Sequence, residues 1–109
     1  MTPWFDTDKV FIGGRWQTCA SGETLPVENP STGEEIARIA RGGGQDIDAA
    51  VEAARSALAG QWGMLTAAER GRLLARLGQL VLDHADALAE MEATDVGKPL
   101  TQARSDVTA

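Results

Sequence analysis

Apolar and polar positions change their period part-way along the chain. Up to about residue 41 the apolar residues lie in short runs bounded by turn residues, which is typical of short strands. One hairpin is predicted from residues 9–12 and 15–18, with Gly13-Gly14 as its two-residue turn. A second is predicted from residues 24–28 and 35–41, because the intervening Asn-Pro-Ser-Thr-Gly is dense in turn residues. A lone hairpin is marginal in water, so both strand pairs need something to pack on.

Beyond the glycines at 42–44 the apolar residues recur three and four positions apart, which predicts helices. The first helix should begin with Asp46 as its N-cap and end at Gly60 and Gly63. Its apolar positions are Ile47, Ala50, Val51, Ala54 and Leu58.

The second predicted helix follows Thr66 and Glu69, which have the spacing of a capping box. It carries one apolar stripe, made of Leu73, Leu74, Leu77, Leu80 and Val81. After a break at residues 83–84, a third helix should run to about Val96, with Gly97 as its C′ residue. Residues 100–109 also read as helical.

Composition and charge narrow the class of protein. A chain of 109 residues is enough for one modest domain, and its net charge of −6 argues against nucleic acid or an anionic membrane surface as a partner. No apolar run approaches the roughly 20 residues of a membrane span. A single cysteine excludes an internal disulfide and fits a reducing compartment, and the first residues do not read as a signal peptide. We therefore expect a cytoplasmic protein.

Two candidate sites are weak on chemical grounds. The three glycines before a helix suggest a phosphate cradle, but their spacing fits neither GxGxxG nor the P-loop, and Asp46 and Asp48 would repel the anion. Cys19 could be a nucleophile only beside a base, and the one histidine, His84, is 65 positions away. We interpret the glycines as a flexible connection and Cys19 as a loop residue.

Asp95 is unusual for its position. It shares a helical stripe with Leu88 and Met91 and falls in a last turn, where the helix dipole disfavours an anion. A half-buried carboxylate there needs a cation. This could be Lys98 or a neighbouring arginine, or it could be a monovalent metal ion held by Asp95 and backbone carbonyls.

Several blocks of the sequence, in a fixed order, resemble the aldehyde dehydrogenase superfamily. They are FIGGRW at 11–16, ENPSTGEEIARI at 28–39, DIDAAVEAARSAL at 46–58, a tryptophan at 62 followed by R-x-x-LL at 70–74, and EATDVGKPLTQAR at 92–104. The resemblance implies an α/β fold, in which residues 9–109 form an incomplete N-terminal part of the Rossmann-like NAD-binding domain and residues 1–8 form a tail.

The resemblance also implies an activity for the longer enzyme. Members oxidise an aldehyde to a carboxylic acid with NAD or NADP, through a thiohemiacetal on a cysteine, and work as homodimers or homotetramers. The catalytic and cofactor-binding residues of the family lie downstream of this region, and Cys19 does not match the catalytic motif. We therefore expect no catalytic or cofactor-binding residue here and an inactive chain. The alternative is a complete, non-catalytic α+β interaction module that reuses this region.

One family site does map onto these residues. Some members bind Na⁺ or K⁺ through two backbone carbonyls and an aspartate, which correspond to Val27, Glu28 and Asp95 here. The resemblance further implies that the apolar stripes at 73–81 and 88–91 are shaped to pack on a large sheet. Two short hairpins cannot cover both, so we expect exposed apolar surface.

Overall fold

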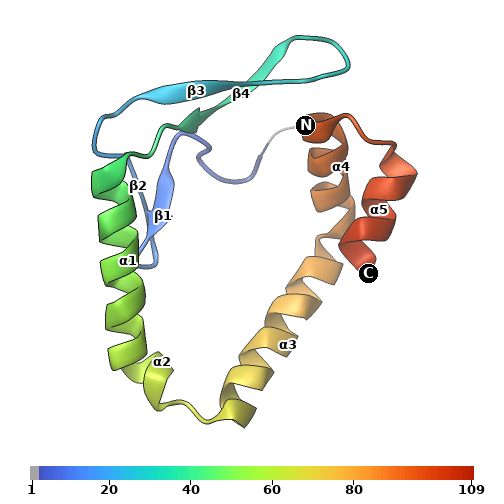
Figure 1. Cartoon of the computed structure of the whole chain (residues 1–109). Coiled ribbons are helices and arrows are strands. Elements are labelled where there is room, and N and C mark those ends of the chain that lie inside the picture. Colours follow the sequence, from blue (N-terminus) through green and yellow to red (C-terminus); the bar gives the residue numbers. More distant parts are fainter. Residues whose placement is uncertain (1–2) are drawn as a thin grey trace. The chain divides into compact units, whose positions relative to one another are not determined.

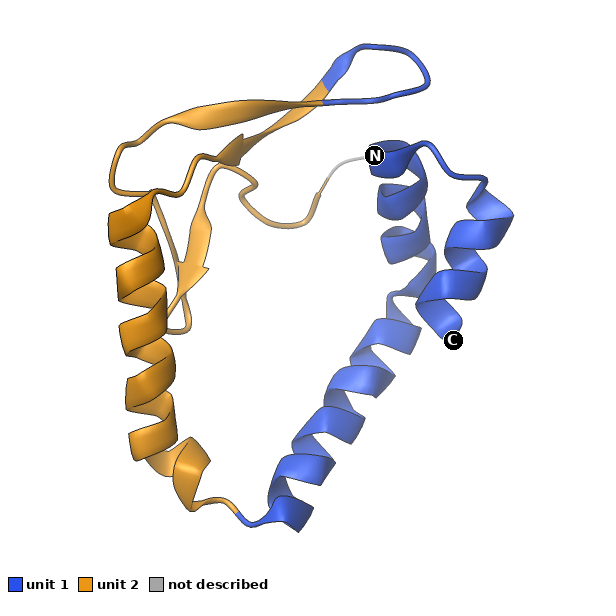
Figure 2. Ribbon diagram, viewed as in Figure 1, with its two compact units in different colours: residues 1–2, 28–35, 66–109 blue, residues 3–27, 36–65 orange. Residues whose placement is uncertain are grey.

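The computed structural model describes residues 3–109 (Figure 1). The described residues form two compact units, one made of residues 3–27 and 36–65 and the other of residues 28–35 and 66–109 (Figure 2). Residues 1–2 of the predicted tail lie outside the described part. The strands are β1 (Val10–Ile12), β2 (Arg15–Gln17), β3 (Thr24–Glu28) and β4 (Glu35–Ala40). The helices are α1 (Gly44–Ala59), α2 (Gln61–Met64), α3 (Ala67–Asp83), α4 (Ala85–Val96) and α5 (Leu100–Thr108).

Both predicted hairpins are confirmed. β1 pairs antiparallel with β2 in the register Phe11 to Trp16, and β3 pairs with β4. Gly13 and Gly14 both have positive φ, at 60° and 78°, which is what a two-residue turn matched to the twist of the strands requires. The glycine pair therefore fixes the register of the first hairpin.

An aromatic cluster anchors the first hairpin. The ring of Phe5 stacks on Trp16 with centroids 5.4 Å apart, and Phe11 lies 5.1 Å from the same tryptophan. Trp4 meets Phe5 edge-on at 5.7 Å. The residues before β1 are thus tied to β2, and this contact supplies part of the packing that a lone hairpin lacks.

The start of α1 corrects the predicted cap. The helix begins at Gly44, with Gly43 as its N-cap residue. Asp46 is therefore the third residue of the helix and not the N-cap. Gly43 is extended, and the Asp46 carboxylate reaches back to accept the Gly43 N–H at 2.8 Å. An acidic residue at this third position can satisfy the N-cap amide, and this lets the helix begin within the glycine run.

The chain turns more sharply after α1 than the sequence predicts. Gly60 caps the helix, but a four-residue helix, α2, follows at once and was not expected. A Cβ at Gly63 would overlap the carbonyl oxygen of Leu58. Gly63 therefore allows α2 to fold back on the end of α1, where any side chain would force the backbone apart.

The capping box of α3 is confirmed. The Glu69 N–H donates to Thr66 Oγ1 at 3.3 Å, and the Thr66 N–H donates to Glu69 Oε2 at 2.7 Å. The backbone N–H of Thr66, and then its hydroxyl, hold the pKa of Glu69 below its usual value. The break that the sequence predicted at residues 83–84 is also present, since His84 ends α3 and precedes α4.

Replacing Thr66 by alanine tests this cap. We expect Thr66→Ala to lower the free energy of unfolding by about 1 kcal/mol, because the hydroxyl that accepts the Glu69 N–H is lost. Urea denaturation followed by circular dichroism measures the change. Thr66→Ser keeps the hydroxyl and should stay close to the original stability; an equal loss in both variants would contradict this role for the cap.

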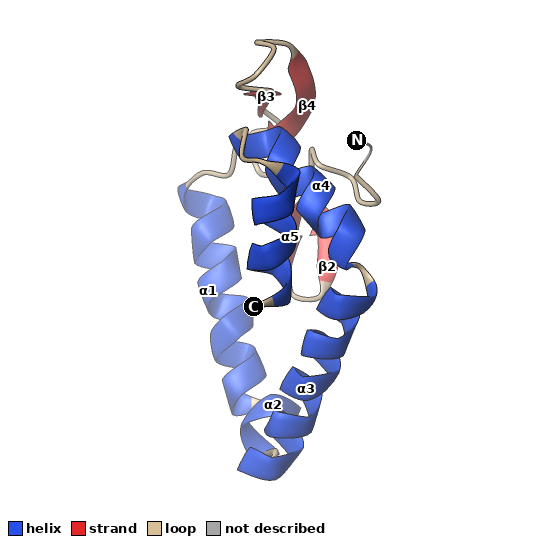
Figure 3. Cartoon of the chain, turned by 90° about the vertical axis from the view of Figure 1, so that its right-hand side faces the viewer, coloured by secondary structure: helices blue, strands red, loops and turns tan. Residues whose placement is uncertain are grey.

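α4 and α5 lie side by side (Figure 3). Each buries one alanine completely, Ala89 on α4 and Ala103 on α5, and these small side chains allow a close approach. α4 ends, as predicted, at Gly97 in the left-handed conformation with φ of 73°. Pro99 then precedes α5. This helix pair is the best-packed part of its unit.

The expected exposure of apolar surface is confirmed for α3. Leu73, Leu74, Leu77 and Leu80 are 40–63 % exposed, whereas Val81 is half-buried. Leu88 and Met91 are half-buried, so the second predicted stripe is partly covered within its own unit. On α1 the large residues Ile47, Val51 and Leu58 are also exposed. Among the described residues no helix is both long and apolar enough to cross a bilayer.

Candidate functional site

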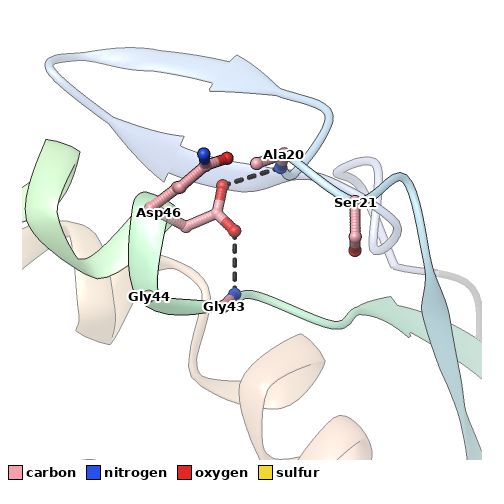
Figure 4. Close-up of a pocket in the computed structure, with 6 residues that line it drawn as sticks. Ala20, Ser21, Gly43, Gly44 and Asp46 are labelled. Atoms are coloured by element: carbon pink, nitrogen blue, oxygen red, sulfur yellow. Dashed lines mark hydrogen bonds between the residues drawn. The ribbon is translucent and has the colours of Figure 1, made fainter.

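A hollow of about 200 Å³ lies at the start of α1 (Figure 4). It is formed by the β2–β3 loop and by the glycine connection that leads from β4 into the helix, and both belong to the same unit. Its lining residues are Ala20, Ser21, Gly43, Gly44, Gln45 and Asp46.

Asp46 dominates the chemistry of this hollow. One carboxylate oxygen, Oδ1, accepts the Ala20 N–H at 2.9 Å, and the other, Oδ2, accepts the Gly43 N–H at 2.8 Å. These bonds, from Gly43 first and then Ala20, hold the pKa of Asp46 below its usual value. Two amide donors that an anion could use are thus taken by the chain's own carboxylate, in agreement with the glycines being a connection and not a phosphate cradle.

Cys19 is enclosed by its own loop. The side chain is 3 % exposed, and its thiol donates to the Glu23 carbonyl at 3.4 Å. Ser21 Oγ lies 3.7 Å from the same sulfur. His84, the base considered from the sequence, stands between α3 and α4 in the other unit. The thiol is buried and hydrogen-bonded to a carbonyl, which agrees with the interpretation of Cys19 as a loop residue and not a nucleophile.

The expectation that Asp95 is half-buried is wrong. Asp95 lies in the last turn of α4 and is exposed. The reason is the direction from which α4 is covered: α5 is its main neighbour, and the completely buried residue of α4 is Ala89, on a different side of the helix. The stripe that Asp95 shares with Leu88 and Met91 is covered only at those two residues.

Lys98 forms ion pairs with residues other than Asp95. Its ammonium group lies 2.7 Å from Glu92 Oε1 and 2.8 Å from Asp106 Oδ2, so it joins α4 to α5. The hydrogen bond to Asp106, followed by that to Glu92, raises the pKa of Lys98. The bond from Lys98, followed by that from Gln102, lowers the pKa of Asp106. Lys98 therefore serves the packing of two helices.

The predicted cation ligands are placed as follows. Val27 and Glu28 are the last two residues of β3; Val27 is half-buried and Glu28 is exposed. Val27 falls in one unit, and Glu28 and Asp95 fall in the other. Within that second unit, the turn after Glu28 comes close to the end of α4, since a Cβ at Gly97 would lie 2.9 Å from Pro30 Cγ. Residues 3–109 contain no group of three or more His, Cys, Asp or Glu side chains that could hold a metal ion.

The profile of the aldehyde dehydrogenase family matches residues 16–109. The chain belongs to this family. Human retinal dehydrogenase 2 is 45 % identical over 97 residues, which are 87 % of this chain and 19 % of that protein. The chain therefore spans about a fifth of the length of the curated relatives it matches.

Solved structures agree with the family. A protein from Burkholderia cenocepacia, assigned as an aldehyde dehydrogenase, is 54 % identical with a TM-score of 0.90 over 92 % of this chain and 21 % of its own. An aldehyde dehydrogenase from Bacillus cereus, solved as an NAD⁺ complex, is 41 % identical with a TM-score of 0.90 over 93 % of this chain and 21 % of its own. The predicted fold class, an N-terminal α/β segment of an aldehyde dehydrogenase, is thereby confirmed.

Sequence reasoning missed two tertiary links in this aldehyde dehydrogenase segment. One is the bond from Asp46 to Ala20, and the other is the joint pairing of Lys98 with Glu92 and Asp106. Part of the first could have been found, because glycine is an accepted N-cap residue and an acidic side chain is favoured in the first turn of a helix. The link to Ala20 has no local signal, since the two residues are 26 positions apart.

Proposed function

We propose that this chain supplies the N-terminal, non-catalytic part of an enzyme that oxidises an aldehyde to a carboxylic acid with NAD or NADP. The family match supports this reaction class. The Bacillus cereus relative, solved with NAD⁺, supports a nicotinamide cofactor. We assign no catalytic or cofactor-binding role to any residue of this chain, so the cysteine that forms the thiohemiacetal belongs to another part of the enzyme.

The observation that carries this proposal is the uncovered apolar surface of α3. The four leucines of its apolar stripe, at positions 73, 74, 77 and 80, are all exposed, with Leu74 at 63 % and Leu77 at 57 %. An apolar helix face of this kind marks an interaction site in a soluble protein. The relatives carry about four-fifths of their length outside the matched segment, while the segment itself keeps their backbone at a TM-score of 0.90. The larger body of the enzyme is the partner we assign to this face.

Four finer assignments belong to the same proposal. The enzyme is a homodimer or homotetramer in the cytoplasm, with neither nucleic acid nor a membrane as partner, in keeping with the net charge of −6. It binds Na⁺ or K⁺ through the carbonyls of Val27 and Glu28 and the carboxylate of Asp95. Carbonyl and carboxylate oxygens are suitable ligands for such hard cations, and the exposure of Asp95 leaves its oxygens available.

An activity assay on two proteins tests the proposal. The 109-residue chain, incubated with NAD or NADP and a set of aldehydes, should form no reduced cofactor. A chimera in which this chain replaces the matching fifth of the Bacillus cereus enzyme should oxidise aldehydes. Turnover by the isolated chain would contradict the proposed role, and a folded but inactive chimera would favour the separate interaction module.

A further inference from the structure

A single side chain joins two distant segments at the start of α1. Asp46 accepts one hydrogen bond from Gly43, at the start of its own helix, and one from Ala20, in the β2–β3 loop (Figure 4). The first bond belongs to a helix cap and needs only local sequence. The second fixes a loop 26 positions away, so the carboxylate is a tertiary link as well as a cap.

The loop that Asp46 holds is the one that encloses Cys19. Ala20, which donates to Asp46, is the next residue in the chain. The loop turns tightly, with the Gly22 N–H donating to the Cys19 carbonyl at 2.9 Å and the thiol donating to the Glu23 carbonyl. Gly22 has a φ of 69°, which this turn requires of a glycine. The buried state of the thiol therefore depends on the loop keeping this shape.

Of the two hydrogen bonds that Asp46 accepts, the one from the Ala20 N–H ties the loop at residues 19–22 to the start of α1. The other lining residues of the hollow are Ala20, Ser21, Gly43, Gly44 and Gln45, all uncharged. A loop released from Asp46 can move into the adjoining hollow of about 200 Å³. A hydrogen bond from an amide N–H to a charged carboxylate is stronger than a hydrogen bond between two neutral groups.

We propose that the Asp46 carboxylate is a clasp that holds the loop at residues 19–22 on the start of α1 and thereby keeps the Cys19 thiol out of water. Opening the clasp frees Ala20 and lets the loop unfold locally, while the helices keep their structure. Cys19, which is buried while the clasp is closed, then becomes accessible to water and to thiol reagents. The clasp is independent of the reaction proposed above, because it involves only one unit of this chain.

The rate at which iodoacetamide alkylates Cys19 tests the clasp, because it is the only cysteine. In the full 109-residue chain, Asp46→Ala should raise this rate roughly tenfold or more, since local opening then needs no break of a charge-assisted bond. Asp46→Asn has one acceptor oxygen in place of two, so its alkylation rate should lie between those of the original chain and Asp46→Ala. Asp48→Ala removes a carboxylate from the same helix without touching the clasp, and should react at the original rate.

A second measurement does not depend on any variant folding. In the unchanged chain, hydrogen exchange at the Ala20 amide should be slower than at the neighbouring Ser21 amide, because only the former donates to Asp46. The clasp is overturned if Ala20 exchanges as fast as Ser21, if Asp46→Ala leaves the alkylation rate unchanged, or if Asp48→Ala raises it equally. Circular dichroism that stays helical in Asp46→Ala separates loop opening from global unfolding.

Discussion

Gly97→Ala is expected to lower the free energy of unfolding by roughly 2 kcal/mol or more, because two penalties add. Gly97 has a φ of 73°, a left-handed conformation that an L-residue adopts only with strain. Its new Cβ would also lie 2.9 Å from Pro30 Cγ, so the turn after β3 would have to shift away from the end of α4. Urea denaturation monitored by circular dichroism measures the loss.

Gly33→Ala is the matched control for this prediction. Gly33 has the same φ of 73° and lies in the same unit, but nothing stands within 4 Å of an added Cβ. It should therefore show the conformational penalty alone. Equal losses in the two variants would mean that the turn at Pro30 does not rest on the end of α4.

The second large effect concerns the exposed face of α3. The double variant Leu74→Glu with Leu77→Glu should leave the isolated chain helical, because both side chains are exposed there and glutamate is a good helix former. In the Bacillus cereus chimera the same change should reduce aldehyde oxidation by about 100-fold or more. An uncompensated buried charge costs on the order of 3–5 kcal/mol, and each 1.4 kcal/mol is about a factor of ten.

The control for the leucine variant lies on the same helix. Arg72 is exposed and already polar, so Arg72→Gln should affect neither the isolated chain nor the chimera. If the leucine variant kept full activity in the chimera, the α3 face would not be covered by the rest of the enzyme. If it unfolded the isolated chain, the face would already be packed within it.

Local chemistry explains which parts of the fold could be predicted. Gly13-Gly14 dictates a tight turn and Thr66 with Glu69 dictates a helix start, because in each case the interacting groups are within three positions of each other. The Asp46 cap was placed three residues too far along the chain, since either Asp46 or Gly43 can serve as the boundary when only the sequence is considered.

The candidate sites depended on contacts that no local pattern encodes. Asp95 was expected to be half-buried from its helical stripe, but the direction from which α5 covers α4 decides its exposure. Lys98 was expected near Asp95, yet from the connection between α4 and α5 it donates to Asp106, eight positions further on in α5. The cation at Val27, Glu28 and Asp95 stays a prediction, which rests on family resemblance.

Binding of an apolar fluorescent dye to the isolated chain, followed during heating, tests most directly whether these helices are made to rest on a larger body. We expect the monomeric chain to bind the dye at low temperature through the α3 face and to unfold over a broad range. We also expect the chimera to bind little of the dye, because the rest of the enzyme covers the α3 face. A monomeric chain that binds no dye and unfolds in one sharp, cooperative transition would contradict the account.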